Sequence, residues 1–250
     1  MKGAIIGDII GAPFEFNRTK NDNFKYREEK EKYTDDTVLT IATMKAILNN
    51  TTYEEETIKI TNEYQNKGYG LRFQNWIAGE KKPYNSFGNG SGVSPIGLYF
   101  NTIEEVMEEA KKSAEFTHNH PEGIKGAQVT AIAIFMAKKG ASKQDIKKYI
   151  EDIFKYDLNR QIKDFKDTYQ FNEICQTTVP EAIICFLESN NYEDTIRKAI
   201  SLGGDTDTLA CIAGGIAEAY YKEIPSHLLN RLNILPKDFI ETIKRFYKKI

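Results

Sequence analysis

The sequence is poor in cysteine and histidine and has no long hydrophobic run. Three residues of each type occur among 250, and the cysteines show neither zinc-site spacing nor an even number for disulfides. Cys185 and Cys211 lie in apolar helical patterns, so we expect reduced core residues and a cytoplasmic, reducing environment. No window approaches the roughly 18–20 apolar residues of a membrane span. These absences argue against disulfide-bonded, zinc-binding and membrane-spanning proteins.

An excess of charge of one sign is also missing. The chain has 34 basic and 36 acidic residues and a net charge of −2 at pH 7, so nothing points to bulk binding of nucleic acid or of a membrane surface. Asp8 interrupts the apolar start of the chain, and no convincing cleavage site follows it. We therefore expect a buried first helix rather than a signal peptide.

Period-two alternation bounded by hairpin turns is absent, whereas the helical period recurs throughout the chain. The sequence predicts an all-α fold, a single compact bundle of many helices over residues 1–250 without a domain boundary. The expected helices are 3–12, 35–48, 53–66, a short segment within 69–79, 103–115, 121–138, 143–156, 175–189, 192–201, 206–222, 226–232 and 237–249. Residues 17–32, 81–95 and 157–174 are expected to be irregular, and Pro180 is expected in a first helical turn.

Two helices carry rows of small residues. Gly3, Gly7 and Gly11 are spaced by four in the first predicted helix, and residues 210–217 have alanine and glycine at spacings of three and four. Small residues allow neighbouring backbones to approach closely. We therefore expect the first helix to lie at the centre of the bundle.

Two predicted helices begin with similar acidic turns. Residues 34–37 read Thr-Asp-Asp-Thr, and residues 203–208 read Gly-Gly-Asp-Thr-Asp-Thr. One interpretation is helix capping alone, because aspartate and threonine suit a helix N-terminus. The other is one shared site, because carboxylate and hydroxyl oxygens suit Mg²⁺, Mn²⁺ or Ca²⁺. Four carboxylates exceed what a single Mg²⁺ normally takes, so the second interpretation favours two ions about 3.5–4 Å apart.

Two further segments offer groups for a ligand. Residues 81–95 are rich in glycine, asparagine and serine, so their backbone N–H groups could meet an anion, although a plain surface loop has the same composition. The loop lacks the ending of a nucleotide-binding P-loop and follows no strand. Residues 116–121 contain His118 and His120, which either cap a helix or contact a ligand.

Four segments in this order resemble the ADP-ribosylglycohydrolase family. They are Gly7–Glu15, Thr34–Thr37, Thr117–Ala127 and Gly203–Thr208. The resemblance runs nearly end to end and implies an all-α enzyme with a dinuclear Mg²⁺ or Mn²⁺ centre at the base of a cleft. Residues 88–95 depart from the family pattern, because the loop is shorter and has no Met-Arg pair.

The resemblance also assigns roles to individual residues. One ion would be held by Thr34, Asp35, Asp36 and Asp207, and the other by Asp205, Asp207 and Thr208, with Glu15 as a ligand or near neighbour. Asn89, Gly90 and Ser91 would meet the diphosphate, and His118 would line the ADP-ribose site.

The implied reaction is hydrolysis at the anomeric carbon of the distal ribose, through an oxocarbenium-like state. Asp35 or Asp36 would orient or deprotonate the water, and Glu15 is the second choice for proton transfer, or would gate the metal site. The substrate would be an ADP-ribosylated protein or a related conjugate. The resemblance leaves open the linkage (to arginine, serine, a nucleobase or a small molecule), the choice between Mg²⁺ and Mn²⁺, and the oligomeric state. Two alternatives stay open: a two-metal phosphohydrolase, and a non-catalytic ADP-ribose-binding or toxin-immunity protein.

Overall fold

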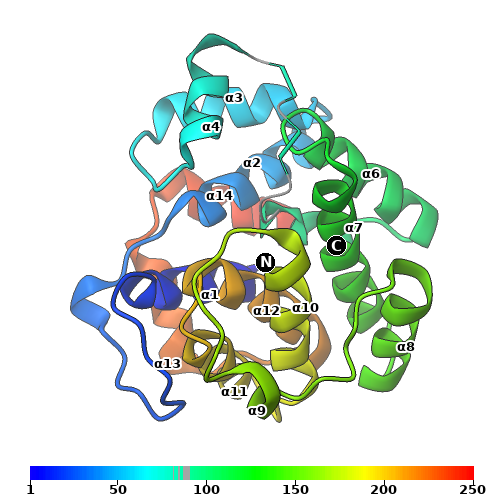
Figure 1. Cartoon of the computed structure of the whole chain (residues 1–250). Coiled ribbons are helices and arrows are strands. Elements are labelled where there is room, and N and C mark those ends of the chain that lie inside the picture. The colour runs from blue at the N-terminus through cyan, green and yellow to red at the C-terminus, as the bar shows by residue number, and fades with distance from the viewer. Residues whose placement is uncertain (81, 84, 87–90) are drawn as a thin grey trace.

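Helices and their connecting loops make up the structure, a computed structural model that describes residues 1–80, 82–83, 85–86 and 91–250 (Figure 1). Within these ranges no strand occurs, so the all-α prediction is confirmed. The α-helices are α1 (Lys2–Gly11), α2 (Asp35–Asn49), α3 (Tyr53–Glu63), α4 (Leu71–Asn75), α5 (Ser94–Tyr99), α6 (Ile103–Glu115), α7 (Pro121–Lys138), α8 (Lys143–Phe154), α9 (Ile162–Phe165), α10 (Cys175–Leu187), α11 (Tyr192–Ser201), α12 (Thr206–Tyr221), α13 (Ser226–Leu229) and α14 (Lys237–Tyr247). Short 3₁₀ helices at Ala12–Phe14, Glu28–Lys30, Ser91–Val93 and Asn230–Ile234 and a π-helix at Trp76–Glu80 complete the pattern.

Helices α1 and α12 pack directly against each other in the middle of the bundle (Figure 1). The glycines of α1 face the backbone of α12, and a Cβ atom on any of them would overlap it. The contacts pair Gly3 with Gly214, Gly7 with Ala210 and Gly11 with Thr206. Numbers rise by four on one helix and fall by four on the other, so the two helices are antiparallel. The expected central position of the first helix is confirmed.

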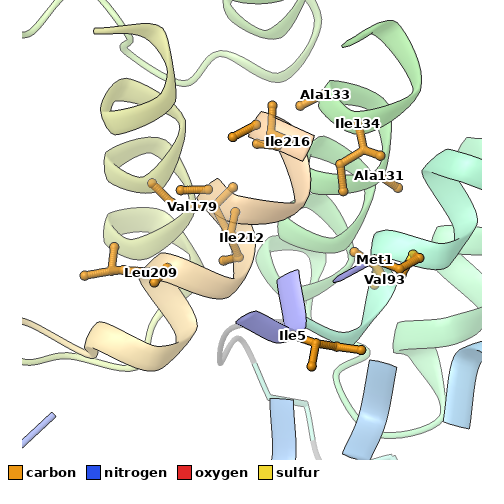
Figure 2. Close-up of a cluster of buried hydrophobic side chains, with 14 of the residues drawn as sticks. Met1, Ile5, Val93, Ala131, Ala133, Ile134, Val179, Leu209, Ile212 and Ile216 are labelled. Atoms are coloured by element: carbon orange, nitrogen blue, oxygen red, sulfur yellow. The ribbon is translucent and has the colours of Figure 1, made fainter. Parts of the chain in front are cut away.

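Helix α12 is buried on its other faces as well. Figure 2 shows Leu209, Ile212 and Ile216 of α12 lying between α10 and α7. Val179 of α10 and Ile134 of α7 meet them, and all five side chains are at most 1% exposed. Burial of apolar surface on every side therefore fixes this helix, and with it the acidic turn at its start.

Two short helices were not predicted: α9 lies wholly within residues 157–174, a stretch expected to be irregular, and α5 begins at the end of another, the glycine-rich stretch, and continues beyond it. Each has fewer than seven residues, which is less than two helical turns and too short to display a helical period. Among the described residues, none of the helices is both long enough and apolar enough to cross a bilayer.

The prediction for Pro180 was wrong. This proline lies inside α10 rather than in its first turn. A proline at such a position removes one helical hydrogen bond and crowds the preceding turn. The carbonyl that loses its helical donor is that of Gln176, four residues before the proline. The hydroxyl of Tyr169 donates to the neighbouring carbonyl of Thr177 at 2.9 Å.

Candidate active site

The acidic turn at the start of α12 depends on two glycines. Gly203 has a φ of +66°, a conformation that glycine adopts readily and other residues rarely do. Gly204 lies against the ring of Tyr169, which leaves no room for a side chain. The turn brings the buried side chains of Asp205 and Asp207 to the helix mouth. The backbone N–H of Thr208 donates to Oδ1 of Asp207 at 3.1 Å and so orients that carboxylate.

The second acidic turn caps α2. Thr34 is the N-cap residue, and its hydroxyl accepts from the backbone N–H of Asp36 at 3.3 Å. The backbone N–H of Asp35 donates to the carbonyl of Lys67 at 2.8 Å. The capping interpretation is therefore confirmed for Thr34, whose hydroxyl makes the cap bond.

Asp8 was not predicted as a site residue, although it ties the first helix to the second acidic turn. This fully buried carboxylate of α1 accepts from the backbone N–H groups of Thr34 at 3.0 Å and Thr37 at 3.1 Å. It also accepts from the hydroxyl of Thr34 at 2.6 Å and from that of Thr37. The sequence held two signals for Asp8: it is an aspartate within an apolar helix, and it belongs to Gly7–Glu15, the first segment that resembles the family.

Glu15, Asp205 and Asp207 form the cluster that could hold a metal ion. Each offers a carboxylate oxygen, and these oxygens lie within 4.8 Å of one another. Glu15 follows the 3₁₀ helix Ala12–Phe14 and is the partly exposed member of the three. Residues separated by about 190 positions in the chain therefore meet, because α1 and α12 are packed in register.

The carboxylates repel one another strongly. Burial, followed by the charge of Asp207, raises the pKa of Glu15 to about 7, against an opposing effect of Lys32. The same two causes raise the pKa of Asp8 to about 7, against the hydrogen bonds from its threonine partners. They also raise the pKa values of Asp35 and Asp205 well above the ordinary range. A divalent cation would relieve this repulsion.

The same repulsion relates the two acidic turns to each other. Burial is the largest cause of the raised pKa of Asp35, and the charges of Asp207, Asp8 and Glu15 raise this pKa further. The pKa of Asp205 is raised by burial, by Asp207 and by Asp36. The carboxylates of both turns are therefore close enough to share one electrostatic site. Hard oxygen donors in this number suit Mg²⁺, Mn²⁺ or Ca²⁺ better than zinc.

The histidine segment lies at the start of α7. His120 is the N-cap residue, and its Nδ1 accepts from the backbone N–H of Glu122 at 3.1 Å, so the capping interpretation is confirmed for this histidine. Nδ1 of His118 lies 2.8 Å from the hydroxyl of Thr117. Burial and the charge of Arg72 lower the pKa of His118 to about 4, so its ring is neutral at pH 7.

The predicted diphosphate contacts fall at the edge of what the structure describes. Asn89 and Gly90 lie outside the described residues, and Ser91 begins a 3₁₀ helix without a described side chain. Two described residues of the same glycine-rich stretch, Asn85 and Ser86, lie beside the histidine segment. The backbone N–H of Asn85 donates to the side chain of Asn119 at 2.7 Å, and the carbonyl of Ser86 lies against Gly123. The glycine-rich stretch therefore approaches the start of α7.

Known proteins resemble this chain over most of its length. A family model described as ADP-ribosylglycohydrolase matches residues 1–250. The chain is 29% identical to ADP-ribosylhydrolase ARH3 of Xenopus tropicalis, over 88% of this chain and 85% of that protein. It is 24% identical to ARH3 of Homo sapiens, over 88% and 84%. One solved structure, an ADP-ribosylglycohydrolase-related protein complex, has a TM-score of 0.75 at 22% identity and covers 99% of this chain and 95% of its own.

Proposed function

Because the chain belongs to the ADP-ribosylglycohydrolase family and is a glycohydrolase acting on ADP-ribosyl groups, we propose that its activity depends on divalent cations. The substrate we propose is an ADP-ribosylated protein side chain or a related conjugate, from which ADP-ribose is released. The observation that carries the proposal is the convergence of Glu15, Asp205 and Asp207 within 4.8 Å. Carboxylates that raise one another's pKa values suit a site that binds cations.

We propose that two Mg²⁺ or Mn²⁺ ions would be held by the residues of the two acidic turns, with Asp207 as a ligand for both. The ligands would be Thr34, Asp35, Asp36, Asp205, Asp207 and Thr208. Bound cations of this kind polarise water and hold vicinal hydroxyl groups. The buried ligands Asp205 and Asp207 are fixed by the core packing of α12, so they would need little rearrangement to bind.

Three carboxylates are the candidates for proton transfer and water orientation. Asp35 or Asp36 would orient or deprotonate the water that attacks the anomeric carbon, as hydrolysis through an oxocarbenium-like state requires. Glu15 is the partly exposed member of the acid cluster, so it could move a proton between Asp205 or Asp207 and solvent. Binding of the substrate beside these groups would also lower the entropic part of the activation barrier, because the ribose and the attacking water are already held together.

The remaining predicted residues would bind ADP-ribose. We propose that His118 lines this site and that Asn89, Gly90 and Ser91 meet the diphosphate. The neutral ring of His118, whose pKa is about 4, supports hydrogen bonding or stacking rather than an ionic contact. The approach of the glycine-rich stretch to the start of α7 supports a common ligand for both segments. A cytoplasmic location is part of the proposal and is supported by the burial of all three cysteines.

Product analysis tests the proposal against its alternatives. Substrates ADP-ribosylated on arginine, on serine and on small molecules are incubated with Mg²⁺, with Mn²⁺ and with a chelator. We expect free ADP-ribose with a cation and none with the chelator. Release of AMP or phosphate would instead indicate a phosphohydrolase. Tight ADP-ribose binding without turnover on any substrate would indicate a binding protein.

A further inference from the structure

The hydroxyl group of Thr34 donates one hydrogen bond and accepts another. It donates to Oδ1 of Asp8 at 2.6 Å and accepts from the backbone N–H of Asp36 at 3.3 Å. A threonine hydroxyl has one hydrogen and two lone pairs. Asp8 takes the hydrogen and Asp36 takes one lone pair, so one lone pair remains after these two bonds.

The hydrogen bonds to Asp8 keep its carboxylate as the acceptor and the hydroxyl of Thr34 as the donor. Its Oδ2 accepts three bonds, from the N–H of Thr34 at 3.0 Å, the N–H of Thr37 at 3.1 Å and the hydroxyl of Thr37. Three donors leave no place for a proton on that oxygen. Bonds to an ionised carboxylate are short and strong, and Asp8 itself is fully buried. Oδ1 is thus aimed at the Thr34 hydroxyl.

We propose that Asp8 is a positioning residue for the metal centre and acts through Thr34. By accepting the hydroxyl hydrogen, it leaves the remaining lone pair of Thr34 available to a cation. The inference rests on the proposed function, in which Thr34 is a metal ligand. It adds a role for Asp8 that does not require contact with a cation or with substrate.

The variant Asp8→Asn separates this role from mere packing. Its side chain has nearly the same shape, and the amide oxygen can still accept from Thr37. The amide nitrogen then occupies the place of Oδ1 and donates to the Thr34 hydroxyl. That hydroxyl must turn its own hydrogen elsewhere, and the lone pair for the cation is lost.

Titration calorimetry with Mn²⁺ on chelator-treated protein measures the effect without any activity assay. We expect Asp8→Asn to weaken Mn²⁺ binding by about 10–100-fold, as loss of a group that orients a metal ligand does. Thr34→Val should also weaken it, and Asp8→Asn should add no further loss in the Thr34→Val background. Thr37→Val is the matched control. It removes the other hydroxyl on the same carboxylate and should lower the urea midpoint while leaving Mn²⁺ affinity within about twofold.

Several results would overturn the inference. If Asp8→Asn has the same effect with and without the Thr34 hydroxyl, Asp8 does not act through Thr34. If Thr37→Val weakens Mn²⁺ binding as much as Asp8→Asn, the role of Asp8 is only to support α2. If the wild-type protein binds no Mn²⁺, the proposed metal centre itself fails, and this result is distinguishable from the other two.

A neutron structure of the deuterated wild-type protein, from crystals held at about pH 8.5 so that Asp8 is ionised, decides the question if Asp8→Asn does not fold. A deuteron on Oγ1 of Thr34 that points to Asp8 supports the inference. A deuteron on Oδ1 of Asp8 contradicts it, because Asp8 would then be the donor and Thr34 the acceptor.

Discussion

Gly7 of α1 faces the backbone carbonyl of Ala210 on α12, and no methyl group fits between them. Gly7→Ala should therefore destabilise the protein by about 3 kcal/mol through overpacking. The atoms that the new methyl group would meet belong to the backbone of Ala210 and Cys211, which cannot move aside as a flexible side chain could. Urea unfolding measures the loss. The control is Gly70→Ala, because Gly70 has an ordinary φ of −58° and open space around it. We expect this variant to stay within about 0.5 kcal/mol of the wild type. Equal losses in both variants would show that the close approach does not limit stability.

Asp207→Asn should separate metal binding from stability. Asp207 contributes to the raised pKa values of Glu15, Asp35 and Asp205, so removing its charge should stabilise the metal-free protein. The same change removes the proposed bridging ligand and should lower Mn²⁺ affinity by about 100-fold or more and abolish ADP-ribose release. Thermal melting with and without Mn²⁺ measures both effects. A variant that keeps the native rate would refute the assignment of Asp207.

Chelator-treated protein should lose stability as pH rises from about 4.5 to 7. The pKa values of Glu15 and Asp8 are raised to about 7 in the folded protein, so the folded chain binds more protons than the unfolded chain across this window. The stabilisation that these two protonated carboxyl groups give is fully present below the ordinary pKa values of glutamate and aspartate. It is lost as the pH rises through about 7.

Cation addition isolates this effect from other titrating groups. The increase in melting temperature on adding Mn²⁺ should itself increase between pH 5 and pH 7.5, by roughly 3–6 °C. Cations compete with protons for the same carboxylates, which explains the direction. An increment that is identical at both pH values would contradict the proposed ligands.

His118→Ala should weaken ADP-ribose binding by about 10-fold, or roughly 1.4 kcal/mol, while changing the melting temperature little. Because the pKa of His118 is about 4, this histidine should give wild-type affinity no pH dependence between pH 6 and 8. Calorimetry with ADP-ribose measures both. His227→Ala is the control, since His227 lies on α13 and pairs with Glu193 at 3.1 Å. Unchanged affinity in His118→Ala would make this histidine structural.

Features that depend on spacing within one helix were predictable from the sequence. The glycines at 3, 7 and 11 indicated a closely packed central helix, and the structure has that helix against α12. The two acidic turns indicated a shared site because each supplied more oxygen donors than a cap uses. Their carboxylates do influence one another, as the raised pKa of Asp205 beside Asp36 indicates.

Features that depend on contacts between distant segments were not predictable. Asp8 lies in a segment that resembles the family, but its hydrogen-bonding role appears only once Thr34 and Thr37 are placed beside it. Proline has a general preference for a first helical turn, and only the start of α10 at Cys175 shows that Pro180 lies deeper in the helix. Helices of four to six residues, such as α5 and α9, carry too little periodicity to be identified.

The glycine contacts between α1 and α12 also restrict how this enzyme can diversify. Sliding one helix along the other by a single residue would shift it by about 1.5 Å and rotate a larger side chain into the backbone of its neighbour. The next position that restores glycine opposite backbone lies a full four residues away, about 6 Å along the axis. The separation between Glu15 and Asp207 therefore cannot drift gradually. New substrate preferences would have to arise in the surrounding loops, with the geometry of the acids inherited unchanged.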